Sequence, residues 1–390
     1  MLLKVNIKNY NDVKKQMYKS EDVLNKYAAK SEDAVRLKEE KKQDIRLEYA
    51  HDIDRIIHSL SYTRYIDKTQ VYSNSHDDNI SKRMTHVQFV SRTSQTIARA
   101  LGLNEDLCEA ISLGHDIGHV PFGHAGERIL NKISKKYIGQ VFAHNVQSMR
   151  NFMFVENRGK GLNLTIQTLD GMICHNGEFI SDKYEPIKKD KDILLKEYND
   201  CYKDEKYINA LIPMTLEGCI VRISDIIGYI GKDIEDAIIL GKFKREEIPD
   251  NIVKVLGNTN KDIMNSIILD IIENSFGKSY ISMSNSVYEV LNELKKFNYV
   301  NIYDKSLTDI ELLDMSNMFN KLFLYYLDIL KLKNDGYYNC DIYKVFLKYM
   351  EEDYLKNTSN ERIVIDYIAG MTDDYIKHVY KKNILIKGGR

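Results

Sequence analysis

Apolar residues recur at helical spacing in several segments of the chain. From Val87 to Leu101, apolar or small residues return every three or four positions, which predicts an amphipathic helix over residues 86–101. Gly102 follows at once and is expected to end that helix. The same spacing over residues 310–332 predicts a second long helix.

Breaking residues divide the next segment into two helices. Asn104 is suited to cap a helix that continues to Asp116. Gly118 and Pro121 interrupt the helical pattern just beyond it, and a new helix is expected near Phe122.

Residues 216–240 predict a largely apolar helix that carries one polar stripe. Its members follow one another at steps of three or four residues: Arg222, Asp225, Tyr229, Lys232, Asp233 and Asp236. Such a stripe is either a solvated helix face or a surface that meets a ligand. Gly228 and Gly231 lie beside it and would leave room for a ligand, to which Asp225 could add a carboxylate.

Charge patterns suggest how the rest of the chain is organised. Residues 1–45 are polar and predict an exposed helix or a loose arm, and the charge-rich residues 181–206 predict a solvated insertion. Repeats and Gly/Ser linkers are absent from the sequence. We therefore predict a core over residues 46–250 and a helical C-terminal region over residues 251–390, packed on that core.

The composition favours a mostly helical protein. Only 4 prolines and 20 glycines occur in 390 residues, so few residues interrupt long helices. The formal net charge of −1 provides no global field toward nucleic acid or an anionic membrane. We expect an all-α fold.

The cysteines and the apolar runs predict the compartment. The five cysteines are scattered without a CxxC pair, which argues against a zinc ribbon or a disulfide framework. The N-terminus lacks the apolar core of a signal peptide, and no run approaches the ~18 apolar residues of a membrane span. These features predict a cytoplasmic protein without a membrane-spanning segment.

Ionisable residues are concentrated in the stretch LGHDIGHVPFGHAGE, residues 113–127. His115 and Asp116 stand at a predicted helix end, where imidazole and carboxylate could converge on Mn²⁺, Fe, Zn²⁺ or, less well, Mg²⁺. One His–Asp pair is weak support. The neighbours that strengthen it are His86, His119, His124 and Glu127.

A longer ordered set of motifs identifies a family resemblance. The chain contains, in order, DRIIHS, KTQV, MTH, LGHDIGHVPFGHAGE, HNVQS, GLNLT and TLDG. Over residues 46–240 this set resembles the HD-domain deoxynucleoside triphosphate triphosphohydrolases, which include the bacterial dGTPases and the SAM-and-HD-domain dNTP hydrolases. The resemblance implies an HD-domain helical fold with additional C-terminal helices.

The resemblance also assigns roles to individual residues. The metal ligands would be His86, His115, Asp116 and Asp225. The catalytic residues would be His124 and Glu127 as a pair, with His119 beside them. The substrate contacts would be Gln70, Arg83, His144, Tyr229, Lys232 and Asp233. Of these, Arg83 would grip the triphosphate, and Tyr229 and Asp233 would hold the deoxyribose.

The implied activity is metal-dependent hydrolysis of a dNTP, with dGTP favoured, to deoxynucleoside and tripolyphosphate. Mn²⁺ or Mg²⁺ is the expected metal, with Fe or Zn as alternatives. The family further implies a homo-oligomer, a hexamer or a tetramer, together with a nucleotide activator and single-stranded DNA as candidate partners. Two alternatives are an HD phosphodiesterase or nucleotidase acting on another nucleotide, and a nucleotide-binding regulator on an HD scaffold.

Some parts of the sequence depart from the family pattern or add nothing to it. Val120 replaces a common proline, and residues 251–390 match no motif, so the base preference is the weakest inference. We expect structural or exposed roles for His51, His58, His76 and His378. His175 leaves two alternatives open, a place at the pocket edge or a structural role.

Overall fold

A computed structural model describes residues 7–40, 44–72, 77, 79–176, 180–333 and 336–386. Its first helices are α1 Ile7–Ser20, α2 Glu48–Ile57, α3 Leu60–Thr63, α4 Arg83–Leu101, α5 Glu105–Gly114, α6 Gly123–Ile138, α7 His144–Arg150, α8 Ile166–Ile173, α9 Lys191–Cys201 and α10 Glu205–Asn209. The later ones are α11 Leu216–Ile230, α12 Lys232–Ile239, α13 Asp250–Leu256, α14 Asn260–Ser275, α15 Asn285–Asn298, α16 Asp309–Leu332, α17 Asp341–Val345, α18 Glu352–Asn357, α19 Asn360–Ala369 and α20 Asp373–Tyr380.

The described strands form one small antiparallel pair, in which β1 (Lys183–Tyr184) lies beside β2 (Ile281–Ser282). The all-α prediction is confirmed. No helix in the described ranges is both long enough and apolar enough to cross a bilayer. His76, for which an exposed or structural role was predicted, lies outside the described residues.

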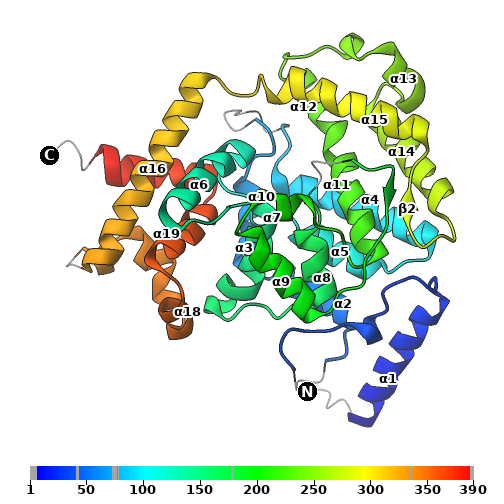
Figure 1. Cartoon of the computed structure of the whole chain (residues 1–390), viewed down its shortest axis with the longest axis horizontal. Helices are drawn as coiled ribbons and strands as arrows, with labels where there is room; N and C mark the ends of the chain where they lie inside the picture. Colours follow the sequence, from blue (N-terminus) through cyan, green and yellow to red (C-terminus); the bar gives the residue numbers. More distant parts are fainter. Residues whose placement is uncertain are drawn as a thin grey trace, which may run out of the picture.

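The centre of the molecule is a bundle of α4, α5, α8 and α11 (Figure 1). The apolar face predicted for α4 is buried, with Val87, Val90 and Ile97 fully enclosed. The helix ends at Gly102, whose φ of 69° is left-handed. Asn104 then caps α5 by accepting from the backbone N–H of Leu107 at 3.3 Å. These local predictions are confirmed.

The single helix predicted over residues 216–240 is wrong, because the chain forms α11 and α12 with a break at Gly231. Asn260 packs so closely there that a Cβ on Gly231 would lie 2.4 Å from its Oδ1. A Cβ on Gly228 would lie 3.0 Å from Val90 of α4. The space directly beside these two glycines is therefore filled by neighbouring helices.

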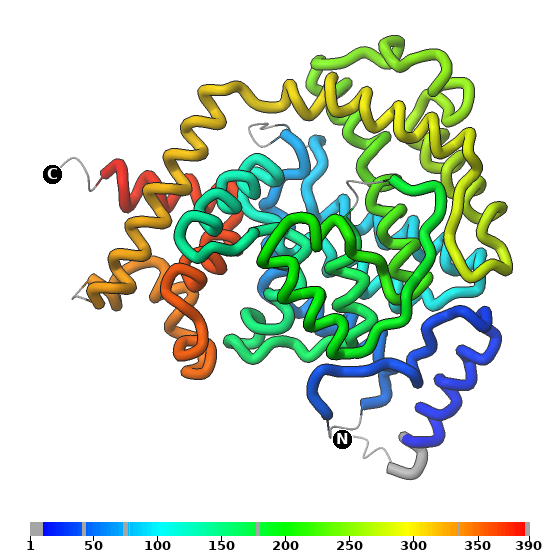
Figure 2. The backbone as a smooth tube through the Cα atoms, in the orientation of Figure 1, coloured from blue at the N-terminus to red at the C-terminus, as the bar shows by residue number. Residues whose placement is uncertain are grey.

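The helices after α12 belong to two different cores. Helices α13 to α15 extend the central core, to which they contribute residues such as Ile252, Ile267 and Leu291. Helix α16 runs away from them to reach α6 and α19, a path that Figure 2 shows in yellow and orange. There Phe319 and Phe323 join Leu130 of α6 in a second core. Helix α6 is thus held mainly by the C-terminal helices.

The two charge-rich segments are more ordered than their composition suggests. The predicted solvated insertion is wrong in part: α9 packs against α8, and the buried Lys189 donates to Asp170 at 2.7 Å and Glu197 at 2.6 Å. Near the N-terminus, α1 is a mostly exposed helix, which was one of the two alternatives. The segment after it is tied down, because the buried Glu21 accepts from Ser31 at 2.7 Å.

Candidate active site

The His–Asp dipeptide lies where the central bundle meets the second core. Helix α5 ends at Gly114, so His115 and Asp116 stand in the turn that leads to α6. Gly118 allows this turn to touch α7, since a Cβ there would lie 2.1 Å from the carbonyl oxygen of His144. The Ser148 Oγ accepts from the Gly118 N–H at 2.8 Å and donates to the His115 carbonyl at 2.5 Å. The turn is therefore fixed by α7.

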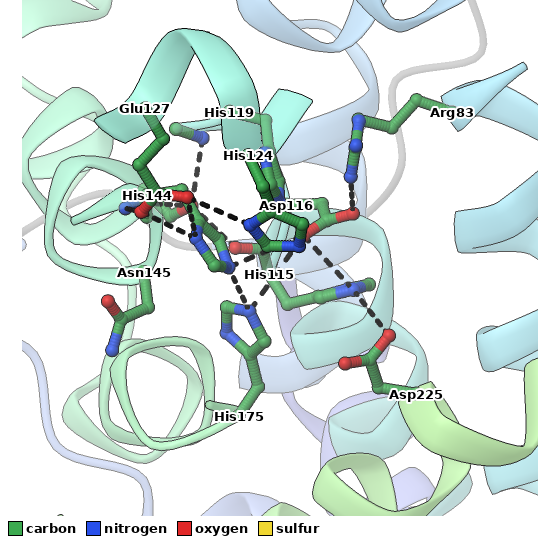
Figure 3. Close-up of polar contacts among 12 residues, drawn as sticks. Arg83, His115, Asp116, His119, His124, Glu127, His144, Asn145, His175 and Asp225 are labelled. Atoms are coloured by element: carbon green, nitrogen blue, oxygen red, sulfur yellow. Dashed lines mark hydrogen bonds and ion pairs between the residues drawn. The ribbon is translucent and has the colours of Figure 1, made fainter. Parts of the chain in front are cut away.

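The four predicted metal ligands come together from three parts of the chain. His86 of α4 places its Nε2 3.0 Å from Oδ1 of Asp225 on α11 and 3.8 Å from Oδ2 of Asp116. His115 places its Nε2 3.6 Å from Asp116 Oδ1 and 3.7 Å from Asp225 Oδ1. Figure 3 shows His115 and Asp225 directed toward the same small volume as Asp116.

This donor set fits a divalent metal ion. The His115 Nδ1 lies 2.6 Å from the Ser112 carbonyl, which directs the proton to that nitrogen and leaves a lone pair on Nε2. That Nε2 is buried and has no hydrogen-bond partner among the described residues. Burial alone would raise the pKa of Asp225, but the neighbouring His115 and His86 rings hold it far below its ordinary value. An ionised carboxylate therefore faces the unpaired imidazole nitrogen.

The predicted catalytic pair is formed, and a third residue joins it. The His124 Nδ1 lies 3.1 Å from Oε2 of Glu127 in the first turns of α6. Glu127 also accepts from His144, from its backbone N–H at 2.7 Å and from its ring Nδ1 at 2.9 Å. Burial would raise the pKa of Glu127, yet His144 and His124 hold it well below the usual range. One ionised carboxylate therefore orients both an exposed and a half-buried histidine.

His119 is buried between the two groups. Its Nε2 lies 3.3 Å from Asp116 Oδ1, and its ring stacks on His144 with centroids 3.9 Å apart. Burial and the nearby Arg83 depress the pKa of His119 far below its ordinary value, so the ring is neutral at physiological pH. Lys68 donates to the carbonyl oxygen of His119, which ties this turn to the segment before α4.

The predicted triphosphate contact Arg83 is the first residue of α4, and the predicted sugar contact Gln70 lies in the segment before that helix. Arg83 is buried and ion-paired with Asp116, and its Nη2 also approaches the Thr69 carbonyl at 3.4 Å. Gln70 follows Thr69 and is half-buried, and its Oε1 has no hydrogen-bond partner in the described part of the chain. A cation and an unpaired amide oxygen are thus available near the metal ligands.

The predicted sugar contacts surround the α11–α12 junction. Asp233 is buried and accepts from the Tyr303 hydroxyl at 2.7 Å, and burial raises its pKa to about 7. Tyr229 is half-buried nearby, where burial and the charges of Asp225 and Asp233 raise its pKa. Lys232 instead pairs with Asp236 at 2.5 Å, so the structure commits this cation to its own helix.

Three residues in and around the site were not predicted or were left open. His175 follows α8 and places its Nε2 3.1 Å from that of His144 (Figure 3). Tyr303 bonds to Asp233 from 70 positions away, and Lys68 supports His119 from 51 positions away. The GMICHNGE segment could only mark His175 as a candidate, and no local pattern distinguishes Tyr303 from other tyrosines. Lys68 opens the KTQV motif, which gave no role for it.

Comparisons with known proteins show the family of this chain. The HD domain family matches residues 83–227, and the phosphohydrolase-associated domain family matches residues 281–382. A deoxyguanosinetriphosphate triphosphohydrolase-like protein of Caldanaerobacter subterraneus subsp. tengcongensis is 38% identical, covering 93% of each chain. Proteins of the same name are 35% identical in Clostridium tetani, covering 92% of this chain and 93% of the relative, and 33% identical in Clostridium perfringens SM101, covering 98% and 97%.

Proposed function

Because this chain belongs to the HD-domain deoxynucleoside triphosphate triphosphohydrolase family, we propose that it hydrolyses a dNTP to deoxynucleoside and tripolyphosphate, with dGTP favoured. One observation supports this most strongly. The metal-type donors around Asp116 adjoin the His124–Glu127 pair, so an electrophilic site and a proton-transfer pair lie side by side. The wider assignment, an HD phosphohydrolase, rests on the family itself.

We assign the divalent cation, Mn²⁺ or Mg²⁺ with Fe or Zn as alternatives, to His86, His115, Asp116 and Asp225. Two imidazoles in the donor set favour Mn²⁺ over Mg²⁺, which prefers an all-oxygen shell. When bound, such an ion neutralises phosphate charge and lowers the pKa of water. The protein itself contributes the fixed orientation of the donors, because Ser112 and Ser148 hold His115 from both ends.

The proposed chemistry breaks the bond between the α-phosphorus and the 5′-oxygen. A water oxygen attacks the α-phosphorus, and the 5′-oxygen leaves as it takes up a proton. His124 is the candidate donor, since its ring is exposed toward solvent while Glu127 holds its Nδ1. Arg83 would neutralise charge on the triphosphate by virtue of its fixed guanidinium fork. His119, being neutral, would act as a hydrogen-bonding partner.

The sugar contacts explain how a deoxyribose could be selected. Tyr303 occupies Oδ2 of Asp233, which leaves Oδ1 to accept from a 3′-hydroxyl. Gln70 supplies a second polar group to that hydroxyl. The ring of Tyr229 would lie against C2′, where a 2′-hydroxyl would collide. Replacing dGTP by GTP should therefore lower kcat/KM.

The direct test is phosphorus NMR of the purified protein with each dNTP, alone and in pairs, in Mn²⁺ or Mg²⁺. We expect tripolyphosphate from the wild type and none from His115→Ala, with dGTP turned over fastest. Orthophosphate or pyrophosphate would instead favour a phosphodiesterase or nucleotidase. Silence under every nucleotide pair would favour a nucleotide-binding regulator.

The family also supports proposals about assembly and partners. We propose a symmetric homo-oligomer, a hexamer or a tetramer, in the cytoplasm, with nucleotide activation and single-stranded DNA as candidate modes of control. Light scattering after gel filtration measures the assembly. Turnover of one dNTP as a second nucleotide is titrated in measures the activation.

A further inference from the structure

A cavity of about 900 Å³ has no part in the proposed function. Its walls come from segments far apart in the chain: the ends of α6 and α7, and parts of α9, α18 and α19. The volume lies in the range of roughly 300 to 1,000 Å³ that is typical of pockets for small organic ligands. None of the described residues that line it belongs to the candidate active site, so its ligand would be distinct from the dNTP.

Positive charge is in excess on the buried side of this cavity. Arg150 and Arg362 both line it, and they share the single carboxylate of Asp366. Arg150 donates to that carboxylate at 2.7 and 2.8 Å, and the Nε of Arg362 donates at 3.2 Å. The other contacts of Asp366, from Gln147 and Tyr354, are neutral. One guanidinium charge is therefore uncompensated where water is scarce, which is unfavourable unless an anion joins the group.

Hydrogen-bond donors are also left over at the same wall. The Nη1 of Arg362 is buried and has no hydrogen-bond partner among the described residues, while its Nη2 donates to Gln147. The hydroxyls of Tyr198 and Tyr202 lie 2.7 Å apart. Each phenol carries one hydrogen and only one of the two can lie in that bond, so the second is free to donate to a ligand. An anion would satisfy both leftover donors.

An aromatic wall adjoins these donors. The ring of Tyr198 lies 6.3 Å from that of Phe154 and 5.2 Å from that of Tyr202, between centroids. The Arg150 guanidinium lies 5.8 Å from the centre of the Phe154 ring. The Arg362 guanidinium lies 5.2 Å from the centre of the Tyr202 ring. Because Tyr198 is buried and Phe154 is exposed, the wall runs from the interior to the surface and offers contact to a flat apolar group.

The acidic residues that line the cavity have solvent-exposed side chains. Glu351 pairs with Lys160 at 2.9 Å, and Glu352 pairs with Lys356 at 2.6 Å. Asp353 lies in the first turn of α18, where the helix end favours negative charge. Solvated charges of this kind are screened, so they do not neutralise the buried guanidinium groups.

We propose that this cavity binds a small organic anion, a carboxylate or a phosphate ester carried on an aromatic body. The anionic group accepts from Arg362 Nη1 and from the spare phenol hydrogen of the Tyr198–Tyr202 pair. The body lies against the aromatic wall that ends at Phe154. This binding requires neither the metal nor turnover of a dNTP, so the inference does not rest on the proposed function.

Isothermal titration calorimetry of the full-length, metal-loaded protein tests the proposal with two probes, benzoate and phenyl phosphate, and the tighter probe identifies the anionic group. Phenol lacks the charge and acetate lacks the ring. We expect the tighter probe to bind at least about 10-fold more strongly than either control, since a hydrogen bond to a charged group is among the stronger polar contacts. A wild-type protein that binds neither probe, or binds phenol or acetate equally well, overturns the proposal.

A pair of variants on α9 locates the binding. Asn199 lines the cavity, and Asn199→Trp would fill it from the exposed side without touching the ion pairs of Asp366. Lys196 is exposed on the same helix and is not among the lining residues, so Lys196→Trp is the matched control. Affinity for the tighter probe should fall at least about 10-fold in Asn199→Trp and stay at the wild-type value in Lys196→Trp. Equal affinity in both variants would place the probe elsewhere, the active site included, and overturn the proposal.

Arg362→Met tests the role of the excess charge. It removes one guanidinium group and leaves Asp366 with its bidentate partner Arg150, so the remaining pair is balanced. Affinity for the anionic probe should fall by at least about 10-fold, while that for phenol should not change. An unchanged affinity for the probe contradicts the assignment of the anionic group to Arg362. The wild-type titration is decisive even if a variant fails to fold.

Discussion

Two buried polar clusters in this protein each surround an aspartate, but they differ in how completely their polar atoms are hydrogen-bonded. The Asp366 cluster consists of a carboxylate on α19 with four donors around it: Arg150, Arg362, Gln147 and Tyr354. The bond from Arg150 is bidentate, with distances of 2.7 and 2.8 Å. Every oxygen of Asp366 is satisfied, so this cluster has the character of a structural clamp between α7 and α19.

The histidine cluster, formed by the residues around Asp116, is left incomplete. Within the described chain, buried atoms without hydrogen-bond partners include His86 Nδ1, His115 Nε2, His119 Nδ1 and Arg83 Nε. Such groups cost free energy when they remain unpaired, so a protein retains them where a ligand completes them. In the Asp366 cluster, among the described residues, one such atom occurs, Arg362 Nη1, so the histidine cluster differs in that several unpaired atoms converge.

The cavity beside the Asp366 cluster does not include the histidine cluster in its described lining. A cavity of about 900 Å³ lies beside the Asp366 cluster and is lined in part by Arg150, Tyr354 and Arg362. Among the described lining residues, none belongs to the histidine cluster. The candidate active site is therefore indicated by the chemistry of its side chains and not by the volume of this cavity.

The largest expected effect is on stability, from Asp366→Ala. Removing the carboxylate leaves the buried Arg362 and the half-buried Arg150 without their partner, which should cost about 3 to 5 kcal/mol of unfolding free energy. Urea denaturation measures the loss. The surface variant Asp328→Ala on α16 should stay within about 0.5 kcal/mol of the wild type.

The turnover of Asp366→Ala tests whether the Asp366 cluster and the histidine cluster have separate roles. If the Asp366 cluster is only a clamp, turnover per folded molecule should stay close to wild type, because Ser148 still holds α7 to the His115 turn. A stable Asp366→Ala protein that has lost turnover would show that the two clusters act as one unit.

Glu127→Gln should have a smaller effect, and on catalysis. The amide keeps the shape of the side chain but loses the charge that orients both His124 and His144, so kcat should fall by about 10- to 100-fold. Steady-state kinetics on the preferred dNTP measures it, and the urea midpoint should move little. An unchanged kcat would mean that Glu127 only fills space.

The smallest effect is the pH dependence of the Asp366 cluster. Burial opposes ionisation, but Arg150 and Arg362 outweigh it and lower the pKa of Asp366 to about 2. Because the folded-state pKa is depressed, the stabilisation is complete above the unfolded value near 4 and is lost as the pH falls toward about 2. The contribution is about 2 kcal/mol.

Comparison with Asp366→Asn isolates this contribution from all other carboxylates. The gap in unfolding free energy between wild type and variant should narrow as the pH falls from about 5 to about 2.5. A gap that stays constant over this range would show that Asp366 does not titrate there.

Local sequence was sufficient for much of the fold and for the centre of the site. Helical spacing and the capping residues at Gly102 and Asn104 predicted α4 and the start of α5, because such signals act within a few residues. The order of the HD-type motifs predicted that His86, His115 and Asp225 would meet, and they do. Local pattern failed at Gly231, where the chain divides into α11 and α12 in close contact with Asn260 of α14.

The sequence by itself determined the helical class and the family and predicted the residues of the site, since these follow from local spacing and from motifs in order. Only the tertiary structure decided which of those residues contact one another. It placed Glu127 between His124 and His144, allowed the Tyr303 hydroxyl to donate to Asp233, and brought His175 close to Asp116. Contacts of this kind join residues far apart in the chain, and they exist only once the helices have packed.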